Sequence, residues 1–171
     1  MKDNFEQCLA LVLKSEGGFV NNPKDPGGMT NLGVTKRAWE EWVGHEVDEA
    51  TMRGLTPEKV KPFYKSRYWD RIKADSLPSG VDYAAYDLAV NSGVGRAAKY
   101  LQEIAGVPSD GIIGPKSLEA INACPADEVV DAMCGMRLEF LKKLPTWDTF
   151  GKGWGRRVAE VEEKAAEMAK T

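Results

Sequence analysis

The spacing of hydrophobic residues along the chain predicts a mainly helical protein. Apolar side chains at positions 5, 8, 9, 12 and 13 fall on one face of a helix that runs from Phe5 to Ser15. The segment 81–91 (VDYAAYDLAVN) is alanine-rich and apolar on more than one face, which indicates a buried central helix. Six further helices are expected, after N-caps at Thr35 and Thr56 and over segments 96–106, 115–123, 127–144 and 156–170.

Turn-forming residues separate these helices. Gly17 and Gly18 stop the first helix, and segment 19–34 is so rich in asparagine, proline and glycine that it forms a short, irregular hairpin at most. The segment 107–114 (VPSDGIIG) predicts a connector, and the glycine- and aromatic-rich segment 147–155 predicts a crossing between the last two helices. The expected fold class is therefore mainly α, with one irregular loop or β-hairpin region after the first helix.

The length and composition limit the classes of function. With 171 residues, 43% of them hydrophobic, the chain can bury a substantial core and is expected to form one compact unit. No segment approaches the roughly 20 apolar residues that span a bilayer, so stable membrane insertion is not expected. The net charge of −3 supplies no positive field, so nucleic-acid binding is not expected either.

The first residues and the cysteines indicate a cytoplasmic product. Acidic residues stand in MKDNFEQCLALVLKSEGG where a signal peptide would be basic, so no export signal is expected. Cys8, Cys124 and Cys134 are odd in number and lack the close pairing of a zinc site. This usage argues against a metal site and indicates reduced thiols, with Cys8 packed on the apolar face of its helix.

A single glutamate stands at the end of the first predicted helix. Exposed carbonyl groups give that helix end a partial negative charge, which disfavours an ionised carboxylate at Glu16 by about 0.3–1 kcal/mol. The same field favours the protonated carboxyl, which is the form that a general acid needs. The alternative interpretation is a solvated glutamate beside a glycine helix stop.

A second carboxyl follows on the turn-rich loop. Asp25 stands between two prolines, and the stiff loop can fold back to bring this carboxyl opposite Glu16. Two carboxyls can cleave a glycosidic bond, and a separation of about 6.5–9.5 Å leaves room for a water and predicts an inverted product. Thr30 and Asn31 could hold that water or a sugar hydroxyl. Alternatively, Asp25 only initiates a turn, and Thr30 and Asn31 are ordinary turn residues.

Aromatic and basic residues alternate between positions 64 and 71. Tyr64, Tyr68 and Trp69 stand among lysines and arginines, a composition suited to stacking on sugar faces and to meeting carboxylates. These three side chains are candidate substrate-binding residues. The alternative places Tyr68 or Trp69 in the hydrophobic core.

The segment SEGGFVNNPKDPGGMTNLGVT, positions 15–35, resembles the opening signature of glycoside hydrolase family 108, the phage and bacterial muramidases that cut peptidoglycan. The similarity continues in KSRYWDRIKADSLPSGVDYAAYDLAVNSGVGRAAKYLQ. VPSDGIIGPKSL and FGKGWGRRV resemble the peptidoglycan-binding lobe that usually follows in this family. The resemblance implies a lysozyme-like helical fold with a catalytic lobe over 1–93 and a helical peptidoglycan-binding lobe over 94–171, packed as one compact unit.

The resemblance also implies an activity and a set of site residues. It implies hydrolysis of the bond between N-acetylmuramic acid and N-acetylglucosamine, with Glu16 as the catalytic acid and with no metal or organic cofactor. Glu16, Asp25 and Thr30 are similar to the Glu, Asp and Thr set of phage-type lysozymes, with the interval from Asp to Thr one residue shorter. Asn91 lies in an Asn-Ser-Gly corner that faces the cleft in this family, where its amide could bind an acetamido group; alternatively, Asn91 caps its helix.

The leading hypothesis is a monomeric endolysin-type muramidase that acts on peptidoglycan glycan strands after holin-type or related release from the cytoplasm. Two other hypotheses stay open. One is a non-catalytic peptidoglycan-binding protein that kept the fold, and the other is a lytic transglycosylase that uses Glu16 alone. The presence of Asp25 favours the hydrolase, because hydrolysis needs a second group to activate water or stabilise the sugar cation.

Overall fold

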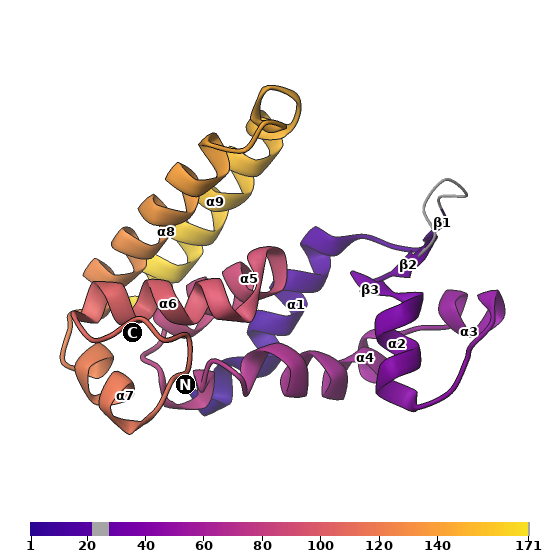
Figure 1. Cartoon of the computed structure of the whole chain (residues 1–171), viewed down its shortest axis with the longest axis horizontal. Coiled ribbons are helices and arrows are strands. Elements are labelled where there is room, and N and C mark those ends of the chain that lie inside the picture. The colour runs from indigo at the N-terminus through magenta and orange to yellow at the C-terminus, as the bar shows by residue number, and fades with distance from the viewer. Residues whose placement is uncertain (22–27, 171) are drawn as a thin grey trace. The chain divides into compact units, whose positions relative to one another are not determined.

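The computed structural model describes residues 1–21 and 28–170 and confirms a mainly helical chain (Figure 1). The α-helices are α1 (Phe5–Glu16), α2 (Lys36–Val43), α3 (Glu49–Arg53), α4 (Pro57–Tyr64), α5 (Val81–Ser92), α6 (Val94–Ala105), α7 (Pro115–Asn122), α8 (Ala126–Lys142) and α9 (Trp147–Ala169). Short 3-10 turns η1 (Lys2–Asn4) and η3 (Ala74–Ser76) and a π-helical turn η2 (Lys65–Trp69) complete the helical set. Among these described helices, none is both long and apolar enough to cross a membrane.

The chain divides into two units. The smaller unit is Leu9–Arg67, and the larger unit combines Met1–Cys8 with Tyr68–Thr171. The division of the chain into lobes at residue 93, and the packing of those lobes as one body, stay predictions.

A small antiparallel sheet in the smaller unit confirms the β-hairpin region expected after the first helix. Its strands are β1 (Val20–Asn21), β2 (Met29–Asn31) and β3 (Val34–Thr35), with β2 in the middle. Only Leu32 and Gly33 separate β2 from β3, and their φ angles of 52° and 77° are those of a type I′ hairpin turn. The sequence therefore predicted the place of this region correctly but underestimated its regularity.

Local capping signals predicted several helix ends correctly. The Thr35 side chain accepts a hydrogen bond from the Ala38 backbone N–H at 3.1 Å, and the Thr56 side chain accepts one from the Lys59 N–H at 3.3 Å. These bonds satisfy amide groups that the first turns of α2 and α4 leave without helical partners. At the end of α1, Gly17 takes a φ of 78°, a left-handed conformation that glycine adopts without steric cost.

The last helix corrects the prediction of a crossing over 147–155, because α9 already begins at Trp147. The glycines of this segment lie inside the helix, although each costs about 1 kcal/mol there relative to alanine. A Cβ placed on Gly151 would stand 2.7 Å from Cε2 of the Trp147 indole, and one on Gly155 would stand 3.8 Å from Cη2. The indole thus lies against bare helix backbone, and this packing overrides the weak helix propensity.

Helix α5 forms the centre of the larger unit and packs against α6, α8 and α9. Its residues 81–89 are buried, as the sequence predicted. Among them is Asp87, which is almost completely buried and pairs with two arginines from the neighbouring helices. Arg137 on α8 donates to its carboxylate at 2.7 Å, and Arg157 on α9 donates at 3.1 Å. This ion network ties three helices of the larger unit together.

The buried thiols predict a loss of stability at alkaline pH. Burial raises the pKa of the Cys134 thiol to about 12 and also raises the pKa of the Cys8 thiol, which additionally faces the charge of Asp82. Unfolded thiols lose their protons near their ordinary pKa of about 8.5, before the folded ones do, so rising pH favours the unfolded chain. We expect each thiol to lower the free energy of unfolding by about 1.4 kcal/mol per pH unit above this value.

Urea unfolding at several pH values between 8 and 10.5, under reducing conditions, measures this dependence. The variant Cys134→Ala should show a shallower decline than the wild type, whatever constant offset the lost sulfur causes. Parallel declines for the two proteins would show that Cys134 does not contribute.

Candidate active site

Glu16 is the last residue of α1, and the β2–β3 turn packs against the stem of its side chain. The point where a Cβ would stand on Gly33 is 2.9 Å from Cγ of Glu16 and 2.5 Å from the hydroxyl oxygen of Tyr64. Glu16 and Tyr64 therefore both approach the space that the missing side chain of Gly33 leaves free. Any larger residue at position 33 would displace one of them.

Tyr64 holds the turn in place from the end of α4. Its hydroxyl donates a 2.6 Å hydrogen bond to the backbone carbonyl of Leu32. Leu32 is one of two described non-glycine residues with positive φ, a conformation that costs roughly 1–2 kcal/mol for an L-residue. The bond from Tyr64 therefore supports a strained turn directly beside Glu16. Because Tyr64 is buried, the structure argues against the expectation that its ring stacks on a sugar.

The other polar candidates of the smaller unit fall into different environments. Thr30 is partly buried on the central strand β2, where it pairs with Val20 on β1 and Thr35 on β3. Asn31 is buried, and its side-chain amide donates to the Met52 carbonyl of α3 at 2.8 Å. Successive residues of a strand point to opposite faces, so Thr30 and Asn31 cannot act on the same ligand from one face of the sheet. The structure thus gives the Asn31 side chain an anchoring role, and the substrate contact expected for it stays a prediction.

Asp25, the expected second carboxyl, lies outside the described residues. Its distance from Glu16, and with it the stereochemical outcome, stays a prediction.

The remaining candidates belong to the larger unit. Trp69 is completely buried, and its indole N–H donates to the Asp75 carboxylate at 2.7 Å. Trp69 therefore belongs to the core, which corrects the expectation that it contacts substrate. Tyr68 is partly buried. Asn91 is exposed, and its side-chain oxygen accepts a hydrogen bond from Arg137 at 3.3 Å.

Asn91 also helps to line a small cavity at the end of α5. The cavity has a volume of about 250 Å³, and Trp154 and Phe140 contribute aromatic walls to it. Arg137, which orients the Asn91 amide, is itself paired with Asp87. Asp87 therefore both pairs with a cation and, through the Arg137 guanidinium, helps to hold the Asn91 amide.

Sequence reasoning missed Gly33 and Leu32 as parts of the site. The signal available was a glycine within Asn-Leu-Gly, two residues short of a helix cap, but leucine is unusual at the first position of a type I′ turn. Within the two described stretches of chain, no group of three or more acidic, histidine or cysteine side chains is arranged to hold a metal ion.

Replacing Gly33 by alanine should reduce activity by about 100-fold, because small displacements of a catalytic group have effects of that size. The new methyl group would collide with the Glu16 stem and the Tyr64 hydroxyl. Gly44→Ala is the matched control, since Gly44 has a similar φ of 83° but no atom within 4 Å of the added Cβ. Both variants carry the same backbone strain, so only Gly33→Ala should lose activity beyond its loss of stability. Equal rates of peptidoglycan hydrolysis for the two variants would contradict this role of Gly33.

Comparison with known proteins shows the family of the chain. Residues 9–93 match the family model described as Glycosyl hydrolase 108, and residues 96–159 match the model described as Predicted Peptidoglycan domain. No curated protein matches the chain. Among solved structures, SagA of Brucella abortus is 42% identical, with a TM-score of 0.89, and the match covers 100% of this chain and 98% of that one. The chain therefore belongs to the glycosyl hydrolase 108 family and is a glycoside hydrolase that degrades peptidoglycan.

Proposed function

We propose that the enzyme is an N-acetylmuramidase, which hydrolyses the bond between N-acetylmuramic acid and N-acetylglucosamine with Glu16 as general acid. One observation carries the proposal. The side chain of Glu16, at the C-terminal end of α1, is packed against a strained, tyrosine-supported turn, inside the segment that matches the glycosyl hydrolase model. Strained backbone beside a functional group is typical of sites where position matters more than stability.

In this mechanism Glu16 transfers its proton to the glycosidic oxygen as the bond to the anomeric carbon breaks. Asp25 accepts a proton from a water whose oxygen attacks the same carbon from the opposite face. Thr30 assists by holding that water. One water is consumed, one new reducing end forms, and the anomeric configuration inverts. Direct attack by Asp25 would instead require the two carboxyls to lie only about 5–5.5 Å apart and would retain the configuration.

Product analysis distinguishes this reaction from the two alternatives. Purified peptidoglycan sacculi are digested with the wild-type protein, and the soluble fragments are examined by mass spectrometry and by NMR of the first-formed reducing sugar. We expect reducing-end muramic acid with an inverted anomer. Anhydromuramyl ends would identify a lytic transglycosylase, and a retained anomer would make Asp25 a nucleophile. An absence of released fragments, with binding intact, would identify a non-catalytic binding protein.

The biological setting belongs to the same proposal. We propose an endolysin-type role for a monomeric enzyme that reaches the wall by holin-type release. We expect added protein to clear a suspension of purified cell walls, which tests the activity. Lysis of cells that express the enzyme with a holin, compared with cells that express it alone, tests the route to the wall.

A further inference from the structure

A cavity near the turn between α8 and α9 is the strongest feature outside the proposed active site. These two helices form a hairpin in the larger unit (Figure 1). The cavity has a volume of about 500 Å³, which lies within the range of roughly 300–1,000 Å³ typical of small-molecule sites. Leu138 and Lys142 of α8 line one wall, and Trp147 with Gly151 lines the other.

The indole of Trp147 forms a flat, partly exposed platform in this cavity. The absence of side chains at Gly151 and Gly155 lets the ring lie close to the backbone of α9. Trp147 also approaches the ring of Trp154 at 6.4 Å between centroids, and Trp154 stacks on the exposed Phe150 at 5.5 Å. A rigid indole with an accessible surface is suited to stacking on the apolar face of a sugar ring.

Charged groups surround this platform. Lys142 and Lys152 supply two exposed ammonium groups, and Asp148 supplies one carboxylate. Lys142 pairs with Glu139, which lies 3.8 Å away and is itself largely exposed, so this pair is weak. The cavity therefore combines an apolar floor with an excess of positive charge, the complement of an amphipathic, carboxylate-bearing ligand.

We propose that this cavity is a second peptidoglycan-binding site, which stacks Trp147 on a sugar ring and pairs Lys142 and Lys152 with the carboxylates of the muramyl sugar or its peptide. The proposal deepens the proposed function and rests on it for the identity of the polymer. All of the lining residues fall within the segment 96–159 that matches the peptidoglycan model. Binding at this second site retains the enzyme on the wall, because a polymer bound at two points dissociates more slowly than one bound at a single point.

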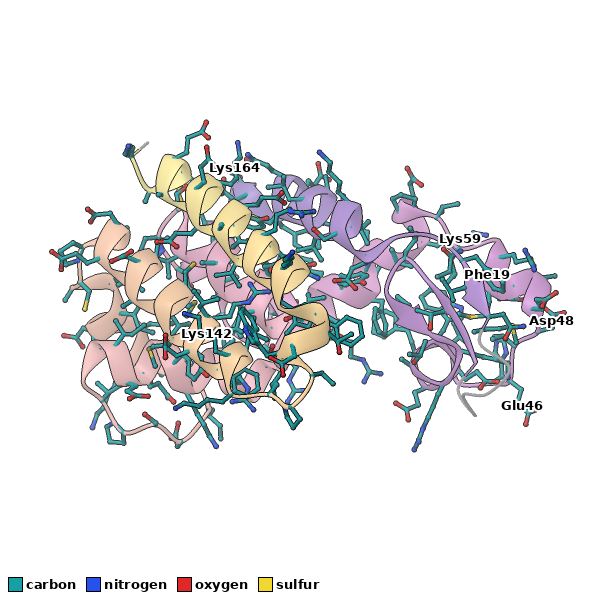
Figure 2. All side chains as sticks on the ribbon, turned by 90° about the horizontal axis from the view of Figure 1, so that it is seen from above. Phe19, Glu46, Asp48, Lys59, Lys142 and Lys164 are labelled. Carbon is teal, nitrogen blue, oxygen red and sulfur yellow. The ribbon has the colours of Figure 1, made fainter. Side chains whose placement is uncertain are left out.

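Lys164 provides a matched control for Lys142. Figure 2 labels both side chains, Lys142 on α8 and Lys164 on α9. Each lysine has a weak pair with a glutamate three residues away on its own helix, at 3.8 Å for Lys142 and 3.9 Å for Lys164. Only Lys142 lines the cavity. Reversal of either charge therefore changes the net charge by the same amount and breaks one weak surface pair.

The test measures cosedimentation with purified sacculi, in a Glu16→Gln background that prevents turnover. We expect Lys142→Glu to weaken binding by about tenfold, and Trp147→Ala to weaken it to a similar extent even in high salt, where charge is screened. Lys164→Glu should bind as the parent does. Sacculi whose carboxyls have been converted to amides should bind the parent as weakly as unmodified sacculi bind the lysine variant. Circular dichroism checks folding, and Trp147→Leu replaces Trp147→Ala if the latter unfolds, because leucine stays apolar but has no ring to stack on a sugar.

Three outcomes would overturn the proposal. Unchanged affinity of both the lysine and the tryptophan variants would exclude the cavity as a binding site. If Lys164→Glu weakened binding as much as Lys142→Glu does, the loss of affinity would come from the net charge of the protein and not from the cavity. Binding to vesicles of phosphatidylglycerol and phosphatidylcholine that the same substitutions abolish, with binding to sacculi intact, would make the hairpin a membrane-contact surface. Release of reducing ends by the wild type, measured separately, reports on the proposed function, so the two can fail independently.

Discussion

Replacing Glu16 by glutamine should abolish peptidoglycan hydrolysis and leave the fold intact. The amide has nearly the same shape as the carboxyl and keeps the Cβ and Cγ atoms that contact the Gly33 turn. It cannot donate the proton that the departing sugar oxygen needs, and loss of general acid catalysis lowers rates by at least about 100-fold. The release of reducing ends from sacculi by the wild type and the variant, at equal concentrations of folded protein, measures the effect.

Glu41→Gln is the matched control for this substitution. Glu41 lies in the same unit on α2, is exposed, and makes a surface pair with Arg37 at 3.7 Å. The same chemical change there should leave the rate unchanged. If folded Glu16→Gln retained more than about a tenth of the wild-type rate, Glu16 would not be the acid.

Removing Asp87 should have the largest effect on stability. The Asp87→Ala variant leaves the guanidinium of Arg137, which is only 2% exposed, without its counter-ion. Arg157 is 18% exposed and can turn toward solvent more easily. Breaking a buried ion pair at one partner costs about 3–5 kcal/mol, because the remaining charge stays desolvated. Urea unfolding followed by circular dichroism should show a loss of this size.

Two further variants identify the cause of that loss. Glu139→Ala removes an exposed ion pair from the same unit, and we expect it to cost no more than about 1 kcal/mol. The double variant Asp87→Leu with Arg137→Met removes both buried charges and should be considerably more stable than Asp87→Ala. A double variant as unstable as the single one would assign the loss to packing and not to the unpaired cation.

The sequence predicted those features that depend on neighbouring residues. The caps at Thr35 and Thr56 and the stop at Gly17 each involve a few consecutive positions, and the structure confirms all three. The start of α9 was predicted wrongly because its glycines favour a loop locally, and only the packing of Trp147 against them makes the segment helical. Propensity alone could not reveal that contact.

The candidate site, too, was predictable only where it depends on neighbouring residues in the sequence. The sequence correctly predicted that Glu16 stands at the end of α1, because the glycines that follow it stop the helix there. The aromatic residues at 64 and 69 looked suited to sugars by composition, but their position on buried faces depends on how the helices pack. Gly33 gained its role from two side chains distant in sequence, Glu16 and Tyr64, which no local pattern brings together.

The glycine-rich start of α9 also has a consequence for local unfolding. Gly151, Gly153 and Gly155 weaken the first turns of this helix, whereas the rest of α9 contains many alanine and glutamate residues that favour helix. Its opening turns depend on the indole that covers them, so the backbone amides there are expected to exchange with solvent sooner than those further along. A ligand that holds the Trp147 ring in place would therefore slow exchange in a segment whose amides it never touches, because it makes the covered helix the favoured state.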